Sequence, residues 1–240
     1  MRPKAARATL LAAPLFLAAC TAPAPVEEQQ AAAEREPVRP NCRVPEGERE
    51  SPTNDAGYFP PALLESGVAC GFRNACTPLL SGFKMDWFAE HLIAAGEPSL
   101  HRAAQQPRAA DARTIRFTWL PSFHNPVTVR IESAGATHRL IARRLSGAGG
   151  YEPGTVQARI ERTLTPAESE RLLAAIERTR LFALPANPCS LGCDGAQWIF
   201  EGIDGEGYHF TNFWSPEDGP GREVGAMLLD LTGWEFEAVY

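Results

Sequence analysis

The sequence predicts an α+β fold in which an antiparallel sheet of about six strands carries two helices on one face. Three observations lead to this prediction. Four segments between residues 114 and 163 alternate apolar and polar residues, a helix start follows at Thr165, and an Asp-Gly turn separates two further alternating segments between residues 197 and 214. Alternation with period two indicates strands with one buried face. Four strands, a helix, two strands and a helix, in that order, are typical of an α+β domain.

The first nineteen residues have the layout of a secretory signal peptide. Arg2, Lys4 and Arg7 precede an apolar stretch that is too short to span a bilayer as a mature helix. The stretch ends in Leu17-Ala18-Ala19-Cys20, which resembles the bacterial lipobox. This resemblance implies cleavage before Cys20 and attachment of lipid to its sulfur. An ordinary signal peptide with an incidental cysteine is the alternative.

A lipid on Cys20 would anchor the mature chain to a membrane of the cell envelope. Thr21 follows the cysteine, and the resemblance to sorted lipoproteins then implies the outer membrane, facing the periplasm. Without residues 1–19 the basic residues fall from 23 to 20 against 29 acidic residues, which gives a formal net charge of −9. We therefore expect no nucleic acid among the partners.

The region after the signal peptide is poor in large apolar residues up to about Pro45. Such a composition does not bury enough surface to offset the entropy of ordering. We predict a lipidated disordered tether over residues 20–50, a small helical segment with a linker over residues 51–113, and the α+β domain over residues 114–240.

Five cysteines remain beside Cys20, namely Cys42, Cys70, Cys76, Cys189 and Cys193. Export favours disulfides. Local pairs Cys70 with Cys76 and Cys189 with Cys193 are one possibility, and a bond from Cys42 to the segment of Cys70 and Cys76 is another. A metal site at Cys189, Cys193 and His209 is a further alternative. We favour disulfides and expect neither metal nor cofactor.

The helical segment carries a stripe of aromatic and apolar residues. Phe83, Trp87, Phe88, His91 and Leu92 are spaced for one face of a helix that ends near Gly96. We interpret this stripe as core packing, with a ligand cleft lined by Trp87 as the alternative.

The predicted strands begin after a linker near residues 103–113. They comprise residues around 115–119, 127–131, 140–145 and 155–163, with one face expected to be in contact with water. The glycine-rich run Gly147–Gly154 precedes the fourth strand. A phosphate-binding loop leads into a helix instead, so we interpret this run as a mobile turn.

The second half of the domain begins with a capping box. Thr165 and Glu168 predict a helix start with Pro166 in the first turn, and the helix runs to about Arg180. A hairpin of residues 197–203 and 208–214 turns at Asp204-Gly205. A last amphipathic helix carries Val224, Met227, Leu228 and Leu231, with Gly233 as its expected C-cap.

Catalytic candidates lie in the hairpin. We expect Glu201 and His209 to meet across it, with His124 as a possible third member. A carboxylate can orient a histidine that acts as a general base. The same pair can be a cross-strand contact worth ~0.2–1 kcal/mol. We favour the structural interpretation because no nucleophile motif accompanies the pair.

Several short motifs resemble those of an uncharacterised group of proteobacterial proteins. They are Phe117-Thr118-Trp119-Leu120 with Phe123-His124-Asn125-Pro126, the run Gly149 to Gly154, the segment Asp194 to Gly202, and Tyr208-His209 with Trp214-Ser215-Pro216. The resemblance covers about half of the chain, from Arg116 to Trp234. It implies a shared fold and no particular activity.

Two classes of function follow. The first is a binding module in the periplasm, in which Trp214, Tyr208 and His124 contact an envelope protein, as an inhibitor or immunity protein does. The alternative is an envelope or cell-wall hydrolase that uses His209 with Glu201 or His124. We favour binding over catalysis because the catalytic constellation is weak.

Overall fold

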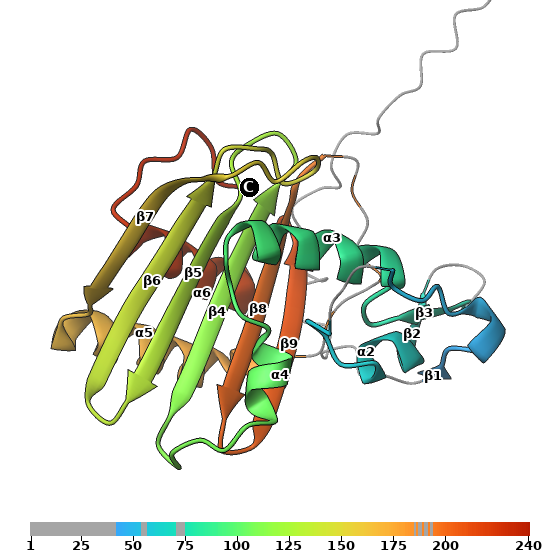
Figure 1. The fold of residues 1–240 in the computed structure, drawn as a ribbon, viewed down its shortest axis with the longest axis horizontal. Coiled ribbons are helices and arrows are strands. Elements are labelled where there is room, and N and C mark those ends of the chain that lie inside the picture. Colours follow the sequence, from blue (N-terminus) through green and yellow to red (C-terminus); the bar gives the residue numbers. More distant parts are fainter. Residues whose placement is uncertain are drawn as a thin grey trace, which may run out of the picture. The chain divides into compact units, whose positions relative to one another are not determined.

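The computed structural model describes residues 42–53, 57–70, 75–184, 186, 189, 192 and 194–240. All of these residues belong to one compact unit. The fold is α+β, as predicted, and contains a six-stranded and a three-stranded antiparallel sheet (Figure 1). No helix in the described part of the chain is long and apolar enough to cross a membrane.

The larger sheet contains all six predicted strands. They are β4 (Arg113–Pro121), β5 (Val127–Ala134), β6 (Thr137–Leu145), β7 (Val156–Thr163), β8 (Ala196–Asp204) and β9 (Gly207–Trp214). Their order is β7-β6-β5-β4-β8-β9, and all neighbours are antiparallel. The chain therefore forms a four-stranded meander and then returns to place the β8–β9 hairpin beside the first strand of that meander.

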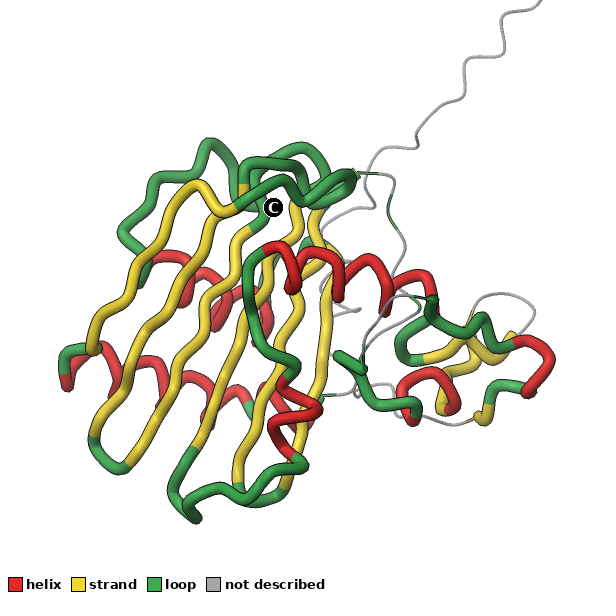
Figure 2. Tube along the Cα trace, viewed as in Figure 1, coloured by secondary structure: helices red, strands yellow, loops and turns green. Residues whose placement is uncertain are grey.

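Two helices cover one face of this sheet, as the sequence predicts (Figure 2). Helix α5 (Pro166–Thr179) begins with the capping box of Thr165 and Glu168, and a short helix η2 (Leu181–Ala183) follows it. Helix α6 (Gly219–Asp230) ends with Leu231 as its C-cap, so the predicted cap at Gly233 is two residues too late. The apolar side chains of both helices pack on Phe117, Trp119, Trp198 and Phe200.

The other face was expected to be in contact with water, and this expectation is wrong for its central strands. Helices α3 (Gly82–Ala94) and α4 (Leu100–Ala104) lie over it (Figure 1). Apolar side chains of α3 pack on Leu120 of β4 and Ile199 of β8. Period-two patterning does not reveal this cover because many of the covered side chains are polar.

The three-stranded sheet has the order β1-β2-β3, with β1 (Cys42–Arg43), β2 (Ser66–Cys70) and β3 (Ala75–Pro78). A short helix η1 (Glu46–Glu48) and helix α2 (Ala62–Glu65) lie between β1 and β2. The expected tether over residues 20–50 thus overlaps structure that starts at Cys42, and the expected helical segment also contains strands. Composition misses this sheet because its strands are short and only a few apolar side chains, such as Val68 and Leu79, add to its backbone pairing and disulfides.

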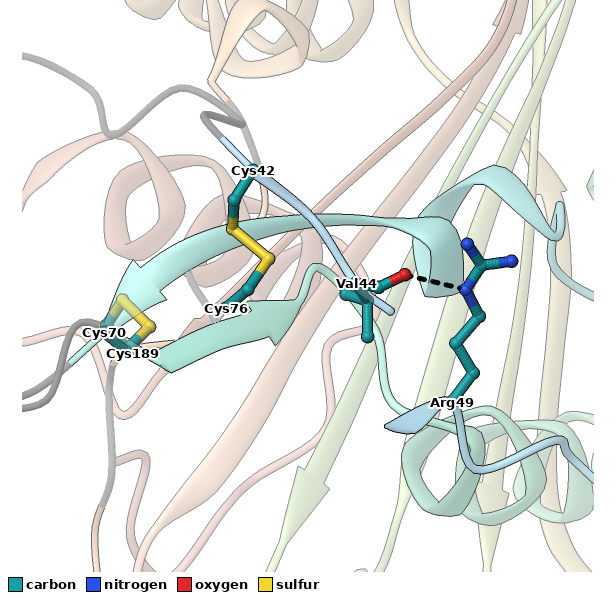
Figure 3. The surroundings of a disulfide bond; sticks show 6 residues. All are labelled: Cys42, Val44, Arg49, Cys70, Cys76 and Cys189. Carbon is teal, nitrogen blue, oxygen red and sulfur yellow. Dashed lines mark hydrogen bonds between the residues drawn. A yellow bond between two sulfur atoms is a disulfide. The ribbon is translucent and has the colours of Figure 1, made fainter. Parts of the chain in front are cut away.

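Two disulfides join the small sheet internally and to the rest of the chain (Figure 3). Cys42 bonds to Cys76, and Cys70 bonds to Cys189 across a sequence separation of 119 residues. The alternative that linked Cys42 to the segment of Cys70 and Cys76 is therefore confirmed, while both local pairs are wrong. Cys20 and Cys193 lie outside the described residues.

The N-terminal strand is also tied to the turn that follows it. The Arg49 Nε atom donates a hydrogen bond of 2.9 Å to the carbonyl oxygen of Val44 (Figure 3). Val44 itself is buried. This contact fixes the path of the chain between β1 and η1.

Candidate functional site

A groove lies between α3 and the connection from β6 to β7. Its volume is about 770 Å³. One side is formed by the outer face of α3, and the other by Gly150 and Pro153 of the Gly147–Gly154 loop. The residues that α3 contributes are Phe83, Asp86, Trp87, Glu90, Ile93 and Ala94.

Helix α3 exposes this face because its opposite face is buried against the sheet. Ser81 caps the helix by accepting a hydrogen bond from the amide of Lys84. Met85, Phe88 and Leu92 are at most 1% exposed. Residues at spacings of three and four lie on one face of a helix, so the residues that line the groove form a second stripe.

The predicted aromatic stripe is therefore divided between these two faces. Phe88, His91 and Leu92 are buried as expected, but Phe83 is exposed. Trp87 is half-buried and lines the groove, as the alternative interpretation allowed. At 100° per residue, the five stripe residues span too wide an arc to share one contact surface.

The glycine-rich loop packs closely against the β4–β5 connection. A Cβ atom at Gly149 would collide with the backbone of Leu120 and Pro121, so only glycine permits this approach. The Gly149 amide donates to the carbonyl oxygens of Pro121 and His124, and the Gly150 amide donates to that of Ser122. Backbone amides that already donate within the protein are not free to hold a phosphate, so the phosphate alternative is not supported.

Helix α3 and the loop are joined directly by side-chain contacts. The Trp87 indole nitrogen donates a hydrogen bond of 2.7 Å to the carbonyl oxygen of Gly149. The His91 Nε2 atom lies 3.5 Å from the carbonyl oxygen of Ala148, which is also in the loop. These contacts hold the two walls of the groove at a defined separation.

All four large apolar side chains that the described residues leave exposed lie beside this groove or its loop. Phe83 and Ile93, on α3, are 63% and 52% exposed, and Phe123 and Tyr151 are 57% and 65% exposed. The rings of Phe83 and Trp87 are 6.0 Å apart, and those of Phe123 and Tyr151 are 6.3 Å apart. Tyr151 itself lies between the two loop residues that line the groove. Exposed apolar surface gathered at one place is characteristic of interaction sites.

The charge of the groove is negative. Asp86 and Glu90 belong to its lining, and none of the lining residues among those the structure describes is basic. Asp86 accepts hydrogen bonds from the backbone amide and the hydroxyl group of Thr53, at 2.8 and 2.9 Å. Glu90 is exposed. The groove thus combines apolar walls with carboxylates.

A buried ionic network fixes the segment that follows α3 to the same face of the sheet. Arg116 and Glu201 are both fully buried, and the Arg116 Nη2 atom lies 2.6 Å from Glu201 Oε2. Arg116 also donates to the carbonyl oxygen of Pro98, while Arg130 donates to Glu97 at 2.7 Å. This network positions the end of α3, and therefore one end of the groove.

Burial and neighbouring charges shift the pKa of Arg116 in opposite directions. Burial alone would lower the pKa of Arg116, but the carboxylates of Glu201 and Glu97 outweigh burial and raise this pKa. Burial raises the pKa of the Tyr208 phenol well above its ordinary value. The Tyr208 hydroxyl donates to Glu201 Oε1 at 2.9 Å. With both pKa values raised, Arg116 stays charged and Tyr208 stays neutral near neutral pH, which is typical of a structural network.

The expected meeting of Glu201 with His209 does not occur. In the hairpin register, Phe210 lies opposite Glu201 and Gly202 lies opposite His209, so the two side chains are on different faces. A shift of one residue in register moves every side chain to the other face. The partner of Glu201 is instead Arg116, on the neighbouring strand β4.

His209 contacts a different carboxylate. Its Nε2 atom lies 2.9 Å from Asp204 Oδ1, at the edge of a smaller pocket of about 190 Å³. Partial burial alone would raise the pKa of Asp204, but hydrogen bonds from His209 and from the Glu206 amide outweigh it and lower the pKa. The aromatic ring of Phe182 lies 5.6 Å from the imidazole.

His124 lies apart from both candidates. Its Nδ1 atom is 2.8 Å from the hydroxyl group of Tyr240, and its Nε2 atom is 3.7 Å from Glu237. Tyr240 also accepts, through its carbonyl oxygen, a hydrogen bond of 2.8 Å from the Trp198 indole. His124 therefore belongs to the contacts of the C-terminal segment, and the structure does not bring Glu201, His209 and His124 together.

The predicted contact residues Tyr208 and Trp214 do not form one surface. They lie at opposite ends of β9, about 20 Å apart along the strand. Tyr208 is engaged in the ionic network, and the indole of Trp214 packs closely over Gly192 and Gly195. His124 is separate from both, and the binding roles of these three residues stay predictions.

The metal alternative is not supported at its described members. The sulfur of Cys189 is bonded to Cys70, so it is not available as a thiolate ligand. Within the described residues, no group of three or more His, Cys, Asp and Glu side chains is placed to hold a metal ion.

The groove includes residues that the sequence alone did not identify as a site. The sequence pattern places Phe83 in the core and gives Ile93 no role, and it includes Phe123 and Tyr151 only in the motifs of the resemblance, without a function. The one available signal was the excess of apolar residues on α3, whose two stripes exceed what one buried face needs. No known protein family matches the chain, and no curated protein matches it either.

Proposed function

We propose that the protein is a membrane-anchored lipoprotein of the cell envelope whose folded part is a binding module, with the groove between α3 and the Gly147–Gly154 loop as its binding site. The observation that carries this proposal is that the four large apolar side chains left exposed among the described residues lie in one groove or beside its loop. Covering apolar surface releases ~25 cal/mol for each Å². A partner that covers Phe83, Ile93 and Tyr151 would gain this free energy.

Two features support the envelope address. The segment that ends in Leu17-Ala18-Ala19-Cys20 resembles a lipoprotein signal. The two disulfides suit an oxidising compartment such as the periplasm. In the proposal, residues 21–41 connect the lipid on Cys20 to the folded part.

The positions of the candidate catalytic groups favour binding over catalysis. A hydrolase needs its acid, base and substrate-binding groups within hydrogen-bonding reach of one point. Glu201, His209 and His124 each contact a different partner, namely Arg116, Asp204 and Tyr240. The groove contains carboxylates and apolar groups but no histidine, serine or cysteine among its lining residues in the described chain.

Site-specific photocrosslinking in intact cells tests the binding site. A photoreactive amino acid replaces Ile93 or Tyr151 in the full-length protein, and Glu170 on α5 serves as the control position because it is exposed and lies on the opposite face of the sheet. We expect one discrete protein adduct from both groove positions and none from position 170. The same adducts at all three positions, or none at the groove, would contradict the proposal.

Lipid labelling tests the anchor. Cells that produce the full-length protein are fed an alkyne-bearing palmitate, and the protein is isolated from the membrane fraction. We expect label on the native protein and none on the variant Cys20→Ala. Equal label on both would show that the lipid is attached elsewhere, and no label on either would contradict the lipoprotein assignment.

A further inference from the structure

We propose that the partner of the groove is a cationic amphipathic helix, a segment that presents apolar side chains on one face and lysine or arginine along its edge. This inference rests on the proposed function of the groove as a binding site. It adds the chemical class and the conformation of the partner.

The apolar walls match one face of a helix in length. The residues that α3 contributes extend from Phe83 to Ala94, which is about 17 Å at 1.5 Å per residue. A partner helix of three to four turns has the same length, with apolar side chains at spacings of three and four residues. Phe83, Trp87 and Ile93 provide apolar contacts along this length.

The charges select a cationic partner. Glu90 is exposed, and it lies between Trp87 and Ile93 in the sequence of the lining stripe. Asp86 lies one helical turn before it and lines the same groove. Glu152 is exposed beside Pro153 on the loop side. Electrostatic complementarity of this kind determines which partners associate and how fast they do so.

The hydrogen bonds at the groove favour a helix over an extended peptide. An extended segment needs partners for its own backbone N–H and C=O groups. The Trp87 indole already donates to the Gly149 carbonyl oxygen, and the amides of Gly149 and Gly150 donate to the β4–β5 connection. A helix satisfies its backbone internally, so it can bind to walls that offer mainly side chains.

The test uses three synthetic peptides and the full mature chain. Cys20→Ser removes the lipid, so no detergent is needed, and export allows the disulfides to form. The first peptide is a 14-residue amphipathic helix of leucine and lysine, the second replaces each lysine by glutamine, and the third keeps the lysines but has two central prolines that prevent a helix. Fluorescence anisotropy of labelled peptide measures Kd at low and high salt.

We expect the lysine peptide to bind at least about tenfold more tightly than either analogue at low salt, with an advantage that shrinks at high salt. The substitution Glu90→Gln in the protein should weaken binding of the lysine peptide about fivefold. Glu170→Gln makes the same change of net charge on the opposite face and should alter Kd less than twofold. Equal effects of the two variants would show attraction by net charge alone and would overturn the inference.

The other outcomes separate this inference from the proposed function. Equal affinity for the glutamine peptide would overturn the cationic class, and equal affinity for the proline peptide would overturn the helix. Both results leave the groove as a binding site, provided that Ile93→Ser lowers affinity. If Ile93→Ser and Phe83→Ser change no Kd and the crosslinks at position 93 are also absent, the groove is not the binding site and both proposals fail.

Discussion

Two neighbouring cross-strand pairs in the middle of the large sheet have opposite chemistry. Arg116 faces Glu201, and Phe117 faces Phe200, on the same two strands β4 and β8. All four side chains are fully buried. The phenylalanine rings stack with centroids 4.8 Å apart beneath α5 and α6, while the ion pair lies on the face that α3 and α4 cover.

The two pairs differ in how many partners they need. Apolar contact is not directional, so Phe117 tolerates any close-packed apolar neighbours. A buried charge is stable only when each of its hydrogen-bonding groups has a partner. Arg116 accordingly contacts Glu201, Glu97 and the carbonyl oxygen of Pro98. The polar face therefore depends on a particular set of long-range contacts, and the apolar face does not.

The largest expected effects come from breaking either pair. Glu201→Ala should lower the free energy of unfolding by about 3–5 kcal/mol because Arg116 then stays buried without its main counter-charge. Phe200→Ala should cost about 3–5 kcal/mol by removing packed atoms and leaving a cavity. Urea denaturation monitored by circular dichroism measures both values.

A second substitution distinguishes the two causes. Replacing both charges, with Arg116→Met and Glu201→Leu, removes the uncompensated charge and should recover most of the loss in the Glu201→Ala variant. Phe117→Ala added to Phe200→Ala enlarges the cavity and should cost more. If the double replacement of the ion pair is as unstable as Glu201→Ala, the charge is not the cause of the loss.

The next largest effect concerns the disulfides at the polar face. Removing the bond between Cys70 and Cys189 with two serines should cost about 2–5 kcal/mol. This bond spans 119 residues and the bond from Cys42 to Cys76 spans 34, so the first should stabilise the protein by about 1 kcal/mol more in the chain-entropy account. Parallel urea titrations of the two cysteine-to-serine pairs test this order, and the reverse order would contradict it.

The apolar face could be predicted from the sequence almost completely. Alternation in β4 to β9 identifies the strands, and Thr165 with Glu168 identifies the start of α5, because each signal is contained within a few neighbouring residues. The wrong end predicted for α6 has a similar cause, since Gly233 has the positive φ of a cap but lies beyond the last helical turn.

The polar face and the groove could not be predicted in the same way. The sequence suggests His209 as the partner of the Glu201 carboxylate because the two residues are close together in the hairpin, whereas the true partner, Arg116, is 85 positions away along the chain. Exposure of Phe83 follows from which side of α3 meets the sheet. That choice depends on Leu120 and Ile199, which no local pattern connects to α3.

A smaller effect on stability is expected at the start of α5, one of the two helices that cover the apolar face. Thr165→Ala removes the side chain that accepts a hydrogen bond from the Glu168 amide at the start of α5. We expect a loss of about 1 kcal/mol in the free energy of unfolding. Thr165→Ser keeps the hydroxyl group and should retain most of this free energy. A loss equal to that of Phe200→Ala would mean that the helix start also determines how the sheet packs.

The smallest effect is a pH dependence at the same helix start. Hydrogen bonds from the Arg162 guanidinium and from the Thr165 amide lower the pKa of Glu168 from its ordinary value of 4.5 to about 2. A carboxylate whose pKa is lower in the folded state stabilises the fold above its unfolded pKa, and this contribution is lost as the pH falls towards the folded pKa. Glu168→Gln should therefore cost under about 1 kcal/mol at pH 7, because the side chain is partly exposed. The difference from the native protein should shrink between about pH 4.5 and 2. The matched control is Glu170→Gln, two residues further along the same helix, which should not reproduce this pH-dependent change in stability. If the difference in stability between Glu168→Gln and the native protein persists unchanged at pH 2, the carboxylate charge is not what Arg162 and Thr165 stabilise.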